Sequence, residues 1–251
     1  MKDYLGFFDA YTLKARFLPA FLATLPLIAL IGCYFNLNQA FVSNVVVGGL
    51  VVFTAIFVLS NFARSNGLKV QEKLLKKWKV LPTTQFLRHN DSTLSKQRKQ
   101  QIHAKISAKT SIVLPTAVEE SNDPQEADLQ YDEAVTWIRE NTRGNDFNVL
   151  LTDNINYGFI RNCLGLKFYA IGICILVLLV FIVLFFLFYP TDSFSREAIL
   201  AFLKVQKMAI WLTVGLTLVM LILWIAVVTE FKVTKAAHKY ANSLLNSTYK
   251  L

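Results

Sequence analysis

The chain has 251 residues, of which 54% are hydrophobic, with 26 Lys and Arg against 17 Asp and Glu. This composition, together with a mean hydropathy of +0.43, excludes an ordinary soluble domain. Three cysteines without a short spacing between them also argue against a disulfide framework or a zinc site.

The hydrophobic residues are concentrated in four runs that contain no Asp, Glu, Lys, Arg or His. A helix of ~20 residues crosses the ~30 Å hydrocarbon layer of a membrane. We therefore predict an all-α membrane protein with four transmembrane helices, arranged as two hairpins that flank a mainly helical cytoplasmic domain. The four runs cover residues 17–35, 45–63, 168–189 and 208–228.

This layout divides the chain into four predicted parts. They are an N-terminal interfacial helix with the first hairpin (1–63), a cytoplasmic ligand-binding domain (64–165), the second hairpin (166–229) and a cytoplasmic C-terminal helix (230–251). The mixture of aromatic and charged residues before Phe17 favours a helix lying at the membrane interface. A cleaved secretory signal fits less well, because the apolar run is long and no small-x-small site follows it.

Glycine and proline mark expected helix ends and contacts. Gly48-Gly49 either lets another helix approach closely or is simply tolerated. Asn66-Gly67 is expected to end the second helix, after which residues 68–79 form an amphipathic helix. Leu81-Pro82 breaks that helix, and Thr83 or Thr84 can cap the short turn that follows.

The rest of the cytoplasmic domain is expected to be helical with polar connections. We predict a basic helix over 96–109, an acidic loop over 119–128 and a helix over 131–142. A further helix, 148–164, leads through Gly165 into the third span. Residues 190–207 form a polar link between the last two spans.

Orientation follows from the basic residues. When both termini and the central domain share one side, that side holds 23 of the 26 Lys and Arg. The positive-inside rule then places this side in the cytoplasm.

The sequence carries no sign of catalysis or of coupled transport. There is no P-loop, HExxH, GxSxG or Cys/His metal cluster, so we predict neither an enzyme nor a cofactor. His89 with Asp91 suits turn capping better than a base and its orienting group. The spans also lack the ionisable residues of coupled transporters. Four apolar helices cannot enclose a hydrated path alone, so a channel would require a homo-oligomer.

The central segment is strongly charge-segregated. Residues 64–109 hold twelve Lys and Arg against two acids, a formal charge of +10, and residues 110–160 hold two Arg against ten acids, a charge of −8. Basic groups interleaved with aromatic Trp78 and Phe86 are typical of phosphate and base binding. Alternatively, the lysines extend toward anionic lipid headgroups, and the aromatic residues are core. The predicted ligand-binding residues are Lys76, Lys77, Arg88, His89, Arg98, Lys99, His103, Arg139 and Arg143.

Three segments of the sequence resemble a known family. PTTQFLRHND (82–91), WIRENTRG (137–144) and NINYGFIRNCLGLK (154–167) are similar to segments of the Hailong-type membrane effectors of bacterial anti-phage defence. That resemblance implies an oligomeric channel gated by a single-stranded oligodeoxyadenylate, which a partner nucleotidyltransferase makes. The SMODS-associated four-helix effectors share the architecture. The other function class left open is a non-conducting membrane scaffold whose basic face binds anionic lipid or a protein partner.

Overall fold

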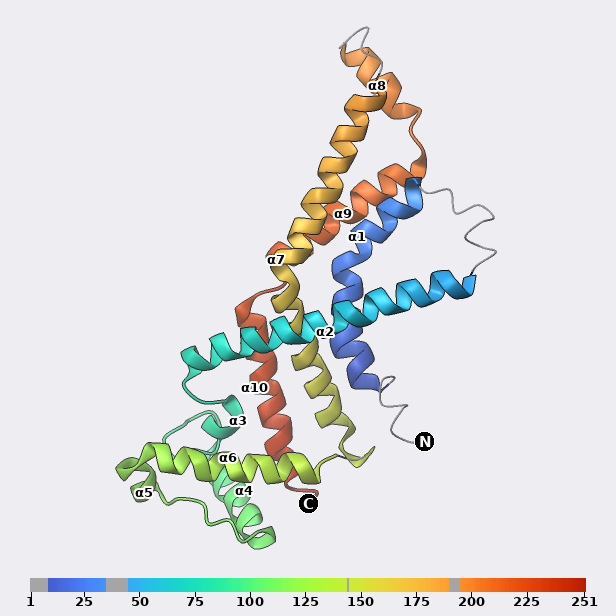
Figure 1. Ribbon diagram of the computed structural model, residues 1–251. Coiled ribbons are helices and arrows are strands. Elements are labelled where there is room, and N and C mark those ends of the chain that lie inside the picture. The colour runs from blue at the N-terminus through green and yellow to red at the C-terminus, as the bar shows by residue number, and fades with distance from the viewer. Residues whose placement is uncertain (1–8, 35–44, 144, 190–194) are drawn as a thin grey trace. The chain divides into compact units, whose positions relative to one another are not determined.

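The computed structural model describes residues 9–34, 45–143, 145–189 and 195–251, without the side chains of Tyr34, 45–53, 55–56 and 145. Over these residues the chain is helical and contains no strand, which confirms the all-α prediction (Figure 1). The main helices are α1 (Leu18–Tyr34), α2 (Val45–Trp78), α3 (Pro82–Gln85), α4 (Lys96–Lys109), α5 (Ala117–Asn122), α6 (Pro124–Asn141), α7 (Asn148–Phe188), α8 (Arg196–Lys204), α9 (Met208–Ala226) and α10 (Glu230–Ser247).

Three helical segments are long and apolar enough to cross a membrane: Thr12–Cys33, Asn148–Phe188 and Met208–Ala226. The remaining predicted span, 45–63, lies in α2, mostly where the side chains are outside the described part of the chain. Gly48 and Gly49 fall there too, so their expected helix contact lies outside the described residues. Four spans in two hairpins therefore stay a prediction.

The N-terminal helix is continuous with the first predicted span. Residues 1–8 of the predicted interfacial helix lie outside the described residues. From Ala10 the chain is helical through a wider π-helical turn, Thr12–Phe17, directly into α1. The π-helical turn ends shortly before Pro19, whose ring would clash with the carbonyl of Ala15 in a regular α-helix.

The predicted helix end at Asn66-Gly67 is wrong, because α2 continues through both residues to Trp78. Gly67 serves close packing instead. A Cβ atom at Gly67 would lie 2.0 Å from Asn162 Oδ1, and one at Gly165 would lie 2.6 Å from the Asn66 carbonyl carbon. Thus α2 and α7 cross with their backbones almost in contact. Lys79, directly after the end of α2, adopts a left-handed φ of 70° and donates its N–H to Leu75 O at 2.8 Å.

The predicted acidic loop 119–128 is also wrong, since all of these residues except Asp123 belong to α5 or α6. A reciprocal capping box between Thr116 and Glu119 starts α5. Asp123 accepts N–H bonds from Gln125 and Glu126, with Pro124 as the first residue of α6. The polar link 190–207 likewise contains α8.

One helix prediction and one capping prediction have opposite outcomes. The basic helix 96–109 is confirmed as α4, capped by Ser95. Neither Thr83 nor Thr84 caps α3, which starts from Leu81 without a side-chain bond. The Thr84 hydroxyl donates instead to Asp132 Oδ1 of α6 at 2.6 Å, a long-range partner that local sequence does not reveal.

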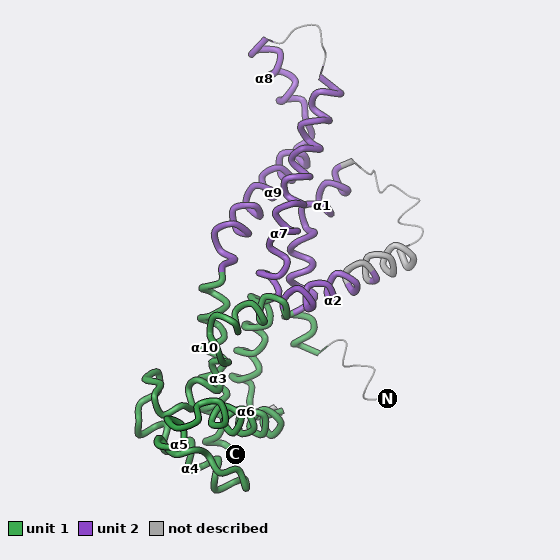
Figure 2. Tube along the Cα trace, turned by 60° about the vertical axis from the view of Figure 1, so that its left-hand side comes forward, with its two compact units in different colours: residues 1–15, 68–161, 230–251 green, residues 16–67, 162–229 purple. Residues whose placement is uncertain are grey.

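The chain divides into two compact units (Figure 2). Unit 1 contains residues 1–15, 68–161 and 230–251, and unit 2 contains residues 16–67 and 162–229. Each of the helices α2 and α7 contributes residues to both units.

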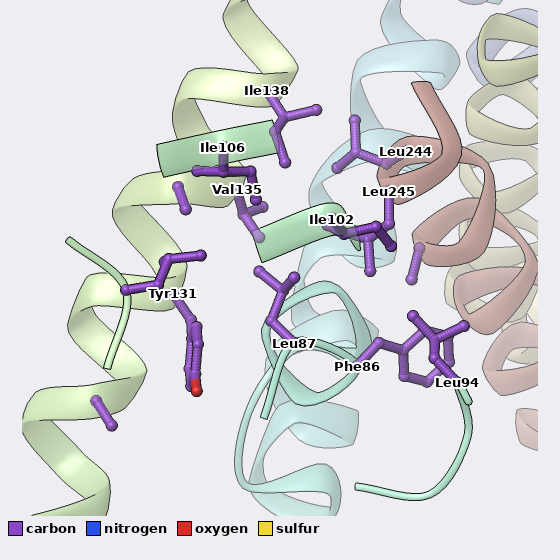
Figure 3. Close-up of a cluster of buried hydrophobic side chains, with 14 of the residues drawn as sticks. Phe86, Leu87, Leu94, Ile102, Ile106, Tyr131, Val135, Ile138, Leu244 and Leu245 are labelled. Atoms are coloured by element: carbon purple, nitrogen blue, oxygen red, sulfur yellow. The ribbon is translucent and has the colours of Figure 1, made fainter. Parts of the chain in front are cut away.

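Unit 1 has its own apolar core, formed by α3, α4, α6 and α10 (Figure 3). Ile102 and Ile106 of α4 lie between Val135 of α6 and Leu245 of α10. Phe86 is almost fully buried here, so one of the two proposed stacking residues is core. This core fixes α6 and α10, which carry much of the candidate site.

In unit 2, α1 packs against α9. Cys33 Sγ and Thr213 Oγ1 lie 2.9 Å apart, and the Thr213 hydroxyl also donates to Ala209 O within its own helix. At the other end of α9, Lys167 Nζ of α7 donates to Ile225 O at 3.0 Å and Val228 O at 2.8 Å. Ile225 lies in the last turn of α9 and Val228 just beyond it, so a cation here stabilises the C-terminal end of the helix.

Candidate functional site: an arginine-lined cavity

Several of the predicted ligand-binding residues already have partners within unit 1. Arg88 makes a bidentate ion pair with Asp128 of α6, with Nε 2.6 Å from Oδ1 and Nη2 bonded to Oδ2. Lys99, only 4% exposed, donates to the carbonyls of Arg88 and Asp91. These two cations therefore hold the loop after α3 onto α4 and α6.

His89 and His103 belong to the same buried polar network. His89 Nε2 lies 2.9 Å from Pro115 O, and His103 Nε2 lies 2.9 Å from Leu87 O. The carboxylate of Glu120 accepts from the N–H groups of His89 (2.6 Å) and Asn90 (3.1 Å) and from the Tyr131 hydroxyl (2.8 Å). Each of these polar groups is satisfied by another part of the fold, as buried polar groups must be.

The surroundings of these groups shift the pKa values of four of them. Burial lowers the pKa of His103 to about 4, so its ring is neutral at pH 7. Burial also lowers the pKa of Lys99, and the hydrogen bond that Arg88 donates to Asp128 raises the pKa of Arg88. For Glu120, burial raises the pKa, but the bonds from His89, Tyr131 and Asn90 outweigh it and leave the pKa below its ordinary value.

The remaining residues predicted from the basic stretch lie on the surface or contact α10. Arg98 Nη2 donates to Asn242 Oδ1 at 2.8 Å and to Asn246 Oδ1. Lys77 pairs with Glu230, which Lys73 also contacts at 3.2 Å. Lys76 is exposed. The fold thus disperses the predicted cluster: Arg88, His89, Lys99 and His103 support the core, and Lys76, Lys77 and Arg98 lie apart from them.

The other two predicted residues, Arg139 and Arg143, line a cavity of about 590 Å³ in unit 1. The cavity is enclosed by α3, α6, α7 and α10 together with Gln71 of α2. Its volume is in the range of small-molecule sites. The polar residues that line it are Gln71, Thr83, Asp132, Arg139, Thr142, Arg143, Asn154, Tyr157, Arg161 and Tyr240.

Arg161 is the residue that distinguishes this cavity. Its side chain is 8% exposed, its guanidinium carbon lies 5.4 Å from the centre of the Tyr157 ring, and Nη1 donates to Gln71 Oε1 at 2.5 Å. Its buried Nε has no hydrogen-bond partner, and no carboxylate among the described residues forms an ion pair with it. Its other hydrogen-bonding neighbour is the neutral Tyr157 side chain, and a buried charge held only by neutral groups is costly.

The charges that line the cavity favour an anion. Three arginines face one carboxylate, Asp132, which gives a formal charge of +2. Asp132 accepts the Thr84 hydroxyl, and Arg139 Nη2 donates to Thr136 Oγ1 at 3.1 Å. Arg139 and Arg143 are exposed, whereas Arg161 is buried in the wall. No group of three potential metal ligands occurs in the described part of the chain.

Sequence reasoning missed Arg161 because it lies outside the basic stretch, just before an apolar run. A usable signal was present, since Tyr157 and Arg161 are four residues apart and lie on one face of a helix. No family model, curated protein or solved structure matches this chain significantly. The function is therefore argued from the cavity.

Proposed function

We propose that this protein is a pore-forming membrane effector that is opened by an anionic ligand bound in the arginine-lined cavity of unit 1. The observation that carries the proposal is Arg161, a buried guanidinium in the wall of an accessible cavity, paired with a neutral side chain. In this proposal unit 1 lies in the cytoplasm, the four predicted spans form two hairpins in a bacterial inner membrane, and several copies line the path.

Chain connectivity supports a link between the cavity and the membrane. Arg161 and the third predicted span are parts of one uninterrupted helix, α7, and Gln71 lies on α2 beyond the second predicted span. A ligand opens such a pore only if it binds the open arrangement more tightly than the closed one. A ligand that contacts both α2 and α7 has the means to favour one arrangement.

The partner chemistry is that of a nucleotide signal. Arginines are well suited to phosphate, and aromatic side chains such as Tyr157 and Tyr240 beside them suit a base. Single-stranded oligonucleotides and smaller nucleotides are the ligands to test, with a nucleotidyltransferase as the functional partner that supplies them. The proposal assigns no catalytic step to this chain.

A non-conducting scaffold is the second candidate. It is favoured by the exposed lysines of α2, Lys69, Lys73 and Lys76, which could contact anionic lipid headgroups. Such a protein would bind anionic vesicles without making them leak.

The test is dye leakage from liposomes that carry the purified protein, with and without single-stranded oligodeoxyadenylate. We expect ligand-dependent leakage, and we expect Arg139→Gln with Arg143→Gln to weaken it by about tenfold or more in ligand concentration. Lys69→Gln with Lys76→Gln is the matched control and should leak as the wild type does. Absence of leakage with every nucleotide tested, despite vesicle binding that depends on the lysines, would favour the scaffold.

A further inference from the structure

We infer that Arg161 anchors the terminal phosphate of a compact ligand, and that this phosphate takes the guanidinium from Gln71, so that binding breaks the α2–α7 hydrogen bond. This inference rests on the proposed function and adds the ligand's chemical class and the contact through which it acts. Three observations support it: the bonding of Arg161, the comparison with Arg88 and the size of the cavity.

The guanidinium of Arg161 has a buried N–H donor without an acceptor. An arginine has five N–H donors, and in Arg161 the hydrogen bond recorded to Gln71 occupies one of them, on Nη1. Nε is buried without an acceptor, although an unsatisfied buried donor is unfavourable. The side chain therefore gains from an arrangement that gives Nε an acceptor of negative charge.

Arg88, in the same unit, has such an arrangement, because its Nε donates to a carboxylate. Its Nε and Nη2, which share one edge of the guanidinium, donate to the two carboxylate oxygens of Asp128. In Arg161 the group at the corresponding position is the unpartnered Nε, and the occupied donor, Nη1, is on the other side. Turning the Nε–Nη2 edge into the cavity would accommodate two oxygens of a phosphate and would break the bond to Gln71. Charge-assisted bidentate bonds are stronger than a bond to a neutral amide.

The size of the cavity limits the ligand. At about 590 Å³ it suits a mononucleotide-sized group rather than several nucleotides of a strand. A phosphate at the end of a molecule can reach a guanidinium that is 8% exposed, whereas a diester inside a strand carries a sugar on either side. Arg139 and Arg143, which are exposed at the same cavity, can hold the remaining charge. The predicted ligand therefore carries a terminal phosphomonoester.

Breaking the Gln71 bond has a structural consequence within unit 1. Gln71 lies on α2 and Arg161 on α7, so their bond ties these two helices together. Ligand binding replaces this tie by a bond from Arg161 to the phosphate, which does not involve Gln71. The ligand-free arrangement then has one α2–α7 hydrogen bond, and the ligand-bound arrangement has a bond from Arg161 to the phosphate in its place. This is the difference in contacts that lets a ligand favour opening.

The experiment uses the full chain in liposomes and two pairs of probes: deoxyadenosine monophosphate against deoxyadenosine, and 5′-phosphorylated against unphosphorylated oligodeoxyadenylate. Binding and leakage are measured at constant ionic strength. We expect only the phosphorylated member of each pair to bind and to open the pore. If both oligonucleotides act equally, the anchor is wrong while the proposed function stands. If neither the phosphorylated nor the unphosphorylated probes bind or act, both proposals fail.

Two substitutions at Gln71 test the exchange without removing Arg161. Gln71→Glu places a carboxylate on the guanidinium and should weaken binding of deoxyadenosine monophosphate at least about tenfold. Gln71→Ala removes the competitor and should tighten binding severalfold. Gln100→Glu, on the exposed face of α4, adds the same charge and is the matched control, expected to bind as the wild type. Equal affinities for the two Gln71 variants and the wild type would overturn the exchange.

Discussion

Arg88 and Arg161 are the same side chain in two environments. Arg88 donates to both oxygens of Asp128, and this bond raises the pKa of its guanidinium. Arg161 has an amide oxygen and the face of an aromatic ring instead. The first arrangement is complete and stabilises unit 1, and the second retains binding capacity for an anion. Residue type alone does not separate the two roles, because their partners lie 40 and 90 residues away.

His103 makes the stability of unit 1 depend on pH. Burial lowers the pKa of its ring from its ordinary value of about 6.5 to about 4, so an unfolded chain takes up a proton at a higher pH than the folded chain. Stability is therefore full above pH 6.5 and is lost as the pH falls toward 4. At 1.36 kcal/mol per pKa unit the loss is at most roughly 3 kcal/mol.

The measurement is urea unfolding of the protein in detergent, followed by circular dichroism at pH 7.5 and pH 5. The wild type should unfold at lower urea at pH 5, and His103→Gln should show a smaller difference between the two pH values. Glu120, whose pKa is below its ordinary value, acts in the same direction at still lower pH. An unfolding midpoint that is equal at both pH values in the wild type would contradict the prediction.

At the scale of the elements, α2 and α7 cross in unit 2 with their backbones almost in contact. A Cβ at Gly165 would meet the backbone of Asn66 and Gly67 at 2.6 Å, and backbone atoms cannot turn away as a side chain can. Gly172 lies on the same helix with no atom within 4 Å of an added Cβ. The two glycines thus differ in surroundings and share a helix.

We predict that Gly165→Ala destabilises the protein by about 1–3 kcal/mol, the usual cost of overpacking. Gly172→Ala should be neutral or stabilising by up to about 1 kcal/mol, since alanine favours a helix. Thermal unfolding in detergent measures both. Equal melting temperatures for the two variants would mean that the helices do not cross as closely as described.

The elements that sequence predicted well are those whose signals are local. The spacing of basic and apolar residues was sufficient for α4. The helix end predicted at Gly67 was wrong because local sequence does not distinguish a glycine that ends a helix from one that lets another helix approach. The contact that requires glycine here is with Asn162 Oδ1, 95 positions away in the chain. The start of α5 could have been predicted from Thr116 and Glu119, which form a recognisable capping box. Within the candidate site, Arg139 and Arg143 were predicted, but Arg161 required the packing of Gln71 and Tyr157 around it.

At the scale of the whole molecule, the two oppositely charged halves of the central segment meet in unit 1. Arg88 of the basic half pairs with Asp128 of the acidic half, and the loop at His89 and Asn90 binds Glu120. The charge segregation along the sequence is thus partly neutralised in the fold. An external polyanion is therefore not required to relieve the repulsion within the basic stretch.

The proposed orientation is tested with cysteines introduced at two exposed positions. Ser121→Cys in α5 of unit 1 should react with an impermeant maleimide only after spheroplasts are lysed, since 23 of 26 basic residues share its predicted side. Val205→Cys, between α8 and α9, should react in intact spheroplasts. The native chain gives the background, since Cys163 and Cys174 are buried and Cys33 is partly exposed. Labelling in the reverse pattern would invert the topology.

The bonds from Lys167 to the end of α9 also determine how the helices of unit 2 match the thickness of a bilayer. From Lys167 to Phe188, α7 is about 32 Å long, and α9 is about 28 Å long. Because Lys167 fixes these helices together at one end, their difference in hydrophobic length falls entirely at the other end, beside α8. Lipids with shorter or longer chains should therefore alter the tilt of α7 and the position of α8, while the end held by Lys167 keeps its depth.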